Sequence, residues 1–372
     1  MSGELVPYYK QSLTLTLGWT IALAYYGYIM YSSNDLISEF AEMVISSRGP
    51  HTQFDHAASY ESANRSSLVF LQAAEHLPES VAVIVTTKEV ASSLGEDLDT
   101  HIICVANLRL AQAKIKQHYD DYRAADAEWN TVHDSAVVHK SATLESGCRI
   151  GPNAVIGANC KIGKRAIVRA CSVIEHGCVI GEDTIINANV NIGYNSQIGD
   201  RVIVQAGAII GSEGYGFVAD SDNHYHRIPH TGNVLIEDDV QVGANSCIDR
   251  GTYGSTHIAR GVKIDNLVHL AHNVSVGEDT LLTAQTVIAG SSKIGKRVIA
   301  SGQTGVLDHK TVPDDTVLVQ RAGVSESLPH GGMWAGSPAK PFKEWVRSQG
   351  LGRKVAKLEE QLKQLKNSIK QD

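Results

Sequence analysis

An aliphatic side chain returns at every sixth position from Val138 to Ile210 without a gap. A period of six fits neither the turn of an α-helix, about 3.6 residues, nor the two-residue alternation of a single strand. It is typical of hexapeptide solenoids, in which three six-residue sides close one triangular coil and the aliphatic side chain points inward. We therefore expect a mainly β chain, built around a parallel β-helix whose coils repeat every eighteen residues.

The repeat stops and resumes twice. It continues at Ile236, Val242 and Ile248, and again from Ile258 to Val324. Residues 211–235 and 249–257 are therefore expected to be insertions in a continuing solenoid, and such insertions often form a binding surface. Glycine often follows the aliphatic residue directly, which predicts corners with positive φ at those glycines.

Outside the repeat, the pattern changes twice along the chain. Residues 1–128 are expected to form a small α/β domain, with strand-like runs at 68–71, 81–85 and 102–105 and a helix-like run at 108–119. The β-helix is expected over 129–340. Residues 341–372 are expected to be a helical segment, because Val355, Leu358 and Leu362 begin a heptad-like spacing that Leu365 and Ile369 continue.

Charge narrows the choice of partners. The net charge of −7 argues against a general nucleic-acid-binding protein. Residues 340–372 nevertheless hold nine Lys or Arg against four Asp or Glu, which fits either an acidic partner or a solvated helix face. The uncharged stretch 13–31 favours a buried or partner-covered segment over a membrane span or a signal peptide, and contact with a membrane surface stays open.

The eighteen-residue period aligns chemistry-bearing residues on successive coils. His272, Gly290 and Asp308 are spaced by eighteen and should form one column, with His309 beside its last member. A neutral imidazole can accept a proton near pH 7, and a bare backbone N–H can face a developing oxyanion. The column therefore suggests a general base, and a merely solvated surface histidine is the alternative.

Three runs in and around this column resemble those of a known family. The run Lys263–Gly277, preceded by Ile248-Asp249-Arg250-Gly251 and followed by Ile288-Ala289-Gly290-Ser291, closely resembles the LpxD family of UDP-3-O-acylglucosamine N-acyltransferases of lipid A synthesis. The segments Gly211–Phe217, Arg227–Pro229, Trp334–Pro338 and Lys343–Trp345 match further parts of the family pattern. The resemblance extends over roughly residues 55–347.

The resemblance implies a homotrimer of left-handed β-helices with active sites in clefts between subunits. His272 would be the general base, the N–H of Gly290 would stabilise the oxyanion, and Asp265 and His309 would be supporting groups. The implied reaction transfers a 3-hydroxyacyl chain from acyl carrier protein to the 2-amine of UDP-3-O-(3-hydroxyacyl)-glucosamine. Acyl carrier protein would be a co-substrate, with no further cofactor and no metal, in the cytoplasm of a Gram-negative-type bacterium, at most in contact with the inner membrane.

Further substrate contacts follow from the same resemblance. They are Phe70, Gly214, Tyr215, Gly216, Phe217 and Asn266. Phe70 occupies the family's aromatic position for uracil, whereas Ala73 stands where an asparagine is expected. A glucosamine and a 2,3-diamino sugar therefore both remain candidates for the acyl acceptor.

Other interpretations compete with this one. A related sugar N-acyltransferase could use acetyl-CoA, and a β-helical assembly protein would need no active site. A γ-type carbonic anhydrase would take zinc ligands from His272 and His309, but Asp314 stands where its third histidine is expected. His224, His226 and His230 are interpreted as solvated histidines or as histidines of a substrate loop, and not as a metal site.

Overall fold

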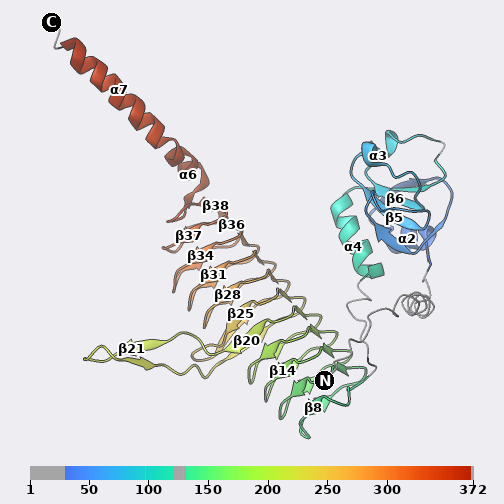
Figure 1. Ribbon diagram of the computed structural model, residues 1–372, viewed down its shortest axis with the longest axis horizontal. Coiled ribbons are helices and arrows are strands. Elements are labelled where there is room, and N and C mark those ends of the chain that lie inside the picture. The colour runs from blue at the N-terminus through green and yellow to red at the C-terminus, as the bar shows by residue number, and fades with distance from the viewer. Residues whose placement is uncertain (1–29, 97, 121–128, 130, 370–372) are drawn as a thin grey trace, which may run out of the picture. The chain divides into compact units, whose positions relative to one another are not determined.

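A computed structural model describes residues 30–96, 98–120, 129 and 131–369, and the chain divides into two compact units, Met1–Asp126 and Ala127–Asp372 (Figure 1). Of the uncharged stretch 13–31, only Met30 and Tyr31 belong to the described residues, as does little of the expected domain boundary near 128. None of the described helices is both long and apolar enough to cross a membrane.

The first unit is an α/β fold around a five-stranded sheet in the order β2-β7-β6-β5-β4. Its strands and helices are β1 (Tyr31–Ser32), α2 (Ser33–Glu39), β2 (Val44–Arg48), β3 (Gln53–Phe54), β4 (His56–Ala58), β5 (Ser67–Leu71), the 3₁₀ turn η1 (Ala74–His76), β6 (Val83–Thr86), α3 (Lys88–Ser92), β7 (His101–Val105) and α4 (Leu108–Asp120). The three predicted strands are confirmed as β5, β6 and β7, which pair in parallel, and the predicted helix is α4.

The second unit is a left-handed parallel β-helix of three sheets. The first sheet contains β10 (Arg149–Ile150), β13 (Ile167–Val168), β16 (Ile185–Ile186), β19 (Ile203–Val204), β24 (Gln241–Val242), β27 (Lys263–Ile264), β30 (Leu281–Leu282), β33 (Ile299–Ala300), β36 (Thr316–Leu318), β38 (Gly332–Ala335) and β39 (Lys340–Pro341).

The second and third sheets have the same construction. The second contains β8 (Val137–Val138), β11 (Val155–Ile156), β14 (Val173–Ile174), β17 (Asn191–Ile192), β20 (Ile209–Ser212), β25 (Cys247–Asp249), β28 (His269–Leu270), β31 (Val287–Ile288), β34 (Gly305–Val306) and β37 (Gly323–Val324). The third contains β9 (Thr143–Leu144), β12 (Lys161–Ile162), β15 (Val179–Ile180), β18 (Gln197–Ile198), β23 (Asn233–Ile236), β26 (Ser255–Ile258), β29 (Ser275–Val276), β32 (Lys293–Ile294) and β35 (Thr311–Val312).

The strand register confirms the predicted coil length. Ile156 pairs with Ile174 in the next coil, and Ile174 pairs with Ile192. The aliphatic residue of each repeat points into the prism, so that Ile156 and Ile174 are at most 1% exposed. The hydrophobic core of this unit is therefore a continuous stack of Ile, Val and Leu, and its burial stabilises the solenoid.

The prediction about the corner glycines holds at Gly211, with φ of 83°, and was wrong at 151, 157, 163, 181, 193 and 199. Gly157 directly follows a core aliphatic residue but has no positive φ, and the left-handed conformation falls two residues later, at Asn159, with φ of 58°. Asn tolerates this conformation because its short polar side chain can bond locally. Glycine is needed at 157 for space, since an added Cβ would lie 2.6 Å from the backbone N of His176 in the next coil.

Both insertions leave the prism at the same edge, between the second and third sheets, which we call the insertion edge. The first, between β20 and β23, is a hairpin of β21 (Phe217–Ala219) and β22 (Tyr225–Arg227). The second lies between β25 and β26. Ile198 then pairs with Ile236, and Ile236 with Ile258, so the core register resumes after each insertion as predicted.

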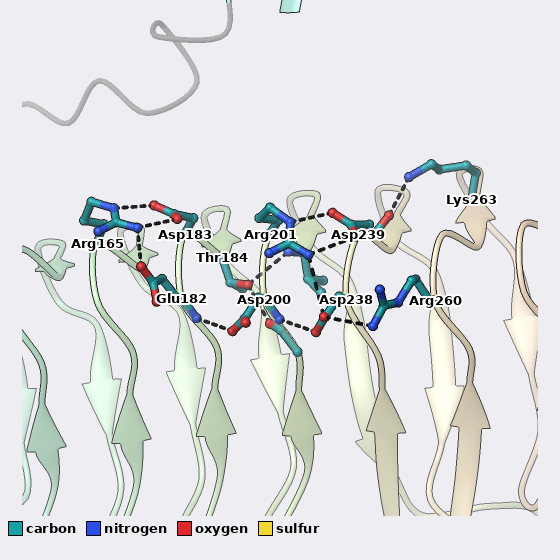
Figure 2. A network of polar contacts seen from close by, with 12 residues as sticks. Arg165, Glu182, Asp183, Thr184, Asp200, Arg201, Asp238, Asp239, Arg260 and Lys263 are labelled. Carbon is teal, nitrogen blue, oxygen red and sulfur yellow. Dashed lines mark hydrogen bonds and ion pairs between the residues drawn. The ribbon is translucent and has the colours of Figure 1, made fainter.

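An ion-pair ladder runs along the edge between the third and first sheets, the ladder edge (Figure 2). Nε of Arg165 donates to Asp183 at 2.7 Å, and Nε of Arg201 donates to Asp239 at 2.7 Å. All four residues occupy the left-handed corner position of their coils. Each arginine therefore spans one coil boundary and pairs with the aspartate directly above it.

Two helices end the chain, α6 (Phe342–Gln349) and α7 (Leu351–Ile369). Along α7, Leu351, Val355, Leu358 and Leu362 are each more than half exposed. The predicted helical segment is confirmed, and the side chains of Leu365 and Ile369 lie outside the described residues. This apolar stripe has no covering element within the described part of the second unit.

Candidate active site

His272 lies on the insertion edge, two residues after the core residue Leu270 of β28. Its imidazole is half-buried, and Nδ1 lies 3.3 Å from Oδ1 of Asn273 and 3.4 Å from Oγ1 of Thr252. Thr252 comes from the second insertion and Asn273 from the corner itself. The Nδ1 side of the ring is therefore held by polar groups.

Gly290 lies directly against the other nitrogen of this ring. An added Cβ at Gly290 would be 2.6 Å from Nε2 of His272 and 2.7 Å from Cε1. The predicted column is thus confirmed in its first step, and the absence of a side chain at position 290 is what leaves room for the imidazole.

The backbone N–H of Gly290 is also distinctive. At the equivalent place on the ladder edge, the N–H of Glu182 donates to Asp200 of the next coil at 2.7 Å. Within the described part of the chain the N–H of Gly290 donates to no acceptor, although Asp308 occupies the corresponding position in its next coil. A buried glycine thus presents an unused donor beside the imidazole.

His309 lies one coil further along the same edge. Its backbone N–H donates to the carbonyl of Gly290 at 2.9 Å, and its side chain is exposed. The structure therefore brings His272, Gly290 and His309 onto one edge, as the spacing predicted.

Asp265 and Asn266 lie elsewhere. They follow Ile264 of β27, at the edge between the first and second sheets. Oδ2 of Asp265 accepts the N–H of Ala284 at 3.0 Å, and Oδ1 of Asn266 accepts the N–H of Ala244 at 2.7 Å. Within one chain these two side chains link successive coils, and the structure does not bring them to the edge that carries His272.

The first insertion places His230 against His272, with ring centroids 4.8 Å apart and an interplanar angle of 67°. His230 is only 3% exposed, and Nδ1 lies 2.9 Å from the carbonyl of Ile228, so Nδ1 carries the proton. Its Nε2 is buried without a partner in the described chain. His230 is close in sequence to His224 and His226, but those two are exposed near Asp220 on the hairpin.

The glycines of this insertion explain how His230 fits. An added Cβ at Gly214 would lie 2.8 Å from its Nε2, and one at Gly216 would lie 2.7 Å from its Cε1. The glycine spacing 214 and 216 was the available signal for a ring packed at this point. Tyr215 and Phe217 point away, are 83% and 44% exposed, and pair with each other at 5.0 Å.

Asp249 is a second residue that sequence reasoning did not single out. It follows Ile248 at the end of β25 and is 6% exposed. Oδ1 accepts the hydroxyl of Ser212 at 2.7 Å, and Oδ2 lies 3.7 Å from Nε2 of His269. Burial raises the pKa of Asp249, against the opposing effects of the Ser212 hydrogen bond and of the imidazoles of His269, His272 and His230.

A pocket of about 460 Å³ lies within the first unit. Phe70 lines it together with Tyr60 and His76, whose rings stack at 4.4 Å with an interplanar angle of 7°. The pocket thus offers flat apolar surfaces, as a planar base requires. Ala73 is not among its lining residues.

One group of described side chains has the donors for a metal ion, namely Asp220, Asp222 and His224 on the hairpin. All three are exposed, and Asp220 also accepts backbone N–H groups of its own turn, from Asp222 at 2.9 Å and His224 at 3.0 Å. The cluster is therefore accounted for as a turn that closes the hairpin. His230 lies apart from this group, against His272.

Comparison with known proteins gives the family. The chain is 40% identical over 327 residues to the UDP-3-O-acylglucosamine N-acyltransferase of Methylococcus capsulatus, a match that covers 87% of this chain and 92% of the relative. It is 49% identical over 199 residues to the enzyme of that name from Helicobacter hepaticus, over 54% of this chain and 61% of the relative.

Two further matches cover less of the chain. The family model described as the GMPPB C-terminal domain matches residues 132–215. The crystal structure of the UDP-N-acetylglucosamine O-acyltransferase of Moraxella catarrhalis is 26% identical with a TM-score of 0.42, and covers 59% of this chain and 77% of that chain. The near full-length match at 40% identity decides the assignment, and favours an acyltransferase over a carbonic anhydrase or an assembly protein. The chain belongs to the UDP-3-O-acylglucosamine N-acyltransferase family.

Proposed function

We propose that this enzyme transfers a 3-hydroxyacyl chain from acyl carrier protein to the 2-amine of UDP-3-O-(3-hydroxyacyl)-glucosamine, with His272 as general base. The observation that carries the proposal is the contact between the His272 ring and the bare backbone of Gly290. It puts a proton acceptor and an unused N–H donor side by side on one edge of the β-helix.

The chemistry requires both groups. The amine must lose a proton as it attacks the thioester carbonyl, and a positioned base typically contributes about 10²–10⁴-fold to such a step. Negative charge develops on the carbonyl oxygen, and one backbone donor is worth roughly 3–4 kcal/mol there. His272 then returns the proton to the departing thiolate. In this scheme Gly290 serves twice, by leaving space for the ring and by supplying the donor.

We infer a homotrimer in which a neighbouring subunit completes the site. Asp265 and Asn266 lie on a different edge from His272, so they can take part only if another chain brings its edge alongside. Exposed aliphatic side chains on the coils, such as Leu281 and Val287, and the apolar stripe of α7 would then be covered. Light scattering of the purified chain should give three times the monomer mass, and a monomer with full activity would contradict the assembly.

Acyl carrier protein is the inferred donor because the C-terminal helices are basic. Lys343, Arg347, Lys354 and Lys357 lie on α6 and α7, and acyl carrier proteins are strongly acidic. Acetyl-CoA is the alternative donor, and comparing turnover with each thioester distinguishes them. No further cofactor and no metal enters the scheme. We place the reaction in the cytoplasm, with the product delivered to the inner-membrane surface.

The pocket of the first unit is the inferred site for the uracil ring. Phe70 and the stacked pair of Tyr60 and His76 supply aromatic surface there. Ala73 lacks the amide that the family pattern places at this point, so recognition of the base would depend on stacking. A UDP-2,3-diamino sugar is the second candidate for the acceptor.

The decisive experiment measures amide formation from 3-hydroxyacyl-acyl carrier protein and UDP-3-O-(3-hydroxyacyl)-glucosamine with the wild type and with His272→Ala. We expect turnover to fall at least about a hundredfold in the variant, with an unchanged assembly state. A variant that retains activity would remove His272 from the mechanism. A wild type that is inactive on this pair but active on a diamino acceptor or acetyl-CoA would replace the substrate assignment.

A further inference from the structure

We infer that Asp249 is a positioning residue for the base, a buried carboxylate that stabilises positive charge on His272 as this imidazole takes up the proton of the amine. The inference rests on the proposed function and adds a residue to it. It starts from the position of Asp249 at the end of β25, where the pairing of Ile248 with Leu270 places it one coil before Ala271, the neighbour of His272 in sequence.

The carboxylate is built into the coil. It is 6% exposed, and its only hydrogen bond within the described residues is the one from the Ser212 hydroxyl at 2.7 Å. Burying a carboxylate is costly unless charge or hydrogen bonds compensate. A single neutral hydroxyl offsets only a small part of this cost, so the nearby imidazoles contribute to stabilising the buried carboxylate.

Three imidazoles act on its charge, two from β28 and the corner after it and one from the first insertion. His269 comes from β28, with its Nε2 3.7 Å from Oδ2 of Asp249, while His272 follows the same strand and His230 comes from the first insertion. Cys247 lies on the strand of Asp249 itself, and burial, followed by the charge of the Asp249 carboxylate, raises the pKa of its thiol.

The guanidinium of the next residue, Arg250, does not pair with Asp249. Nε of Arg250 donates to the carbonyl of Gly211 at 2.8 Å, and its guanidinium carbon lies 3.4 Å from the ring centroid of Tyr194. Compensation for the buried charge therefore comes from imidazoles. The Nδ1–H of His230 is already donated to the carbonyl of Ile228. His269 is 41% exposed, so solvent screens its interaction with Asp249. His272 is half-buried, and it is the imidazole that becomes positively charged near Asp249 when it accepts the proton of the amine.

The charge of the site therefore changes during the reaction and is restored at its end. Before the attack, the site holds one buried carboxylate and a neutral base. When the amine's proton moves to His272, an ion pair forms across a region of low dielectric, where such a pair is far stronger than in water. The proton then passes to the thiolate, and the site returns to its initial charge.

The test is Asp249→Asn, which keeps the shape and the hydrogen bond from Ser212 but removes the charge. We expect kcat to fall about ten- to a hundredfold with little change in KM, because only the charged intermediate stage loses stabilisation. The second readout does not need turnover: mass spectrometry follows carbethoxylation of His272 by diethyl pyrocarbonate against pH. The neutral imidazole is the reactive form, so the rise of this profile should move to lower pH in Asp249→Asn.

Two further variants make the outcome decisive. Ser212→Ala leaves Asp249 in place but removes its hydrogen bond, so it should move the pH profile of His272 in the same direction by a smaller amount. If thermal unfolding shows that Asp249→Asn folds poorly, Ser212→Ala replaces it as the test. Glu237→Gln is the matched control, since Glu237 pairs with Nε2 of His257 at 2.8 Å on another edge, and should leave the His272 profile unmoved.

An unmoved profile in folded Asp249→Asn would overturn the inference, and so would an equal shift in Glu237→Gln. Because carbethoxylation requires no substrate, a shifted profile together with an inactive wild type would instead locate the error in the assigned substrates.

Discussion

Nε2 of His272 lies 2.6 Å from the point at which a side chain on Gly290 would begin, so the ring of the inferred base rests on bare backbone of the next coil. Contacts under about 3 Å cannot be kept by a real Cβ. Any larger residue at 290 must displace the imidazole.

The first prediction follows from this contact. Gly290→Ala should reduce kcat about 10²–10⁴-fold, the range expected for a misplaced base, while the melting temperature changes little. The matched control is Gly302→Ala, where an added Cβ would meet its nearest atom at an ordinary 3.5 Å. Full activity in Gly290→Ala would show that the ring does not need its present place.

A second prediction concerns the pocket of the first unit. Phe70→Ala should raise KM for the UDP-sugar about fivefold or more and leave kcat nearly unchanged, because stacking on a base is worth about 1–3 kcal/mol. Steady-state kinetics with varied UDP-sugar measures this. Ile45→Ala, 54% exposed on β2, is the control. An unchanged KM would move uracil recognition to another part of the chain.

The third prediction concerns the ladder edge. Hydrogen bonding and charge from Arg201 lower the pKa of Asp239 below its ordinary value of 3.8. A carboxyl group with a lowered pKa stabilises the folded state above its unfolded-state pKa, and this stabilisation is lost as the pH falls through the folded-state value. Asp239→Asn should therefore lower the melting temperature at neutral pH and converge with the wild type in acid.

Because the pair is about half exposed, its effect should be small and should shrink in high salt. Thermal unfolding across pH, at low and high sodium chloride, measures both dependences. Asp134→Asn, an exposed aspartate before β8, is the control. A difference between wild type and Asp239→Asn that persists in acid would exclude the ion pair as its cause.

The fourth prediction concerns the core stack. Ile186→Ala removes a side chain that is 0% exposed and should cost about 2–5 kcal/mol in the free energy of unfolding, because the rigid coil cannot close around the cavity. Val137→Ala, at a position that is 62% exposed, should cost less than about 0.5 kcal/mol. Urea unfolding of both variants tests this, and equal losses would contradict the inward orientation of the repeat.

Much of the second unit could be predicted because a period of six leaves little freedom. It determines which side chains are buried, that Ile156 faces Ile174, and that Gly290 lies next to His272. Counting from the core residue also gives the edge: Asp265 follows Ile264 and His272 follows Leu270, so their separation onto different edges was already contained in the repeat.

The remainder of the site lies where the period is interrupted. His230 reaches His272 through an irregular loop, and no spacing rule predicts how such a loop folds back. The repeat does not predict the burial of Asp249, because burial of a polar residue at the end of a strand depends on what the insertions cover. At most of the corner glycines, such as Gly157, close approach of the next coil and not φ requires glycine, which a period of six does not reveal.

The return of Ile236 and Ile258 to the core register after each insertion has an evolutionary consequence. Loops at the insertion edge can lengthen, shorten or be exchanged while the coils beneath them stay in step, so acceptor preference and catalysis can diversify independently. A grafted hairpin from a relative with another substrate would arrive beside an unaltered His272 and Gly290. The coils of the β-helix thus hold His272 and Gly290 in place, while the loops that recognise the substrate can be exchanged.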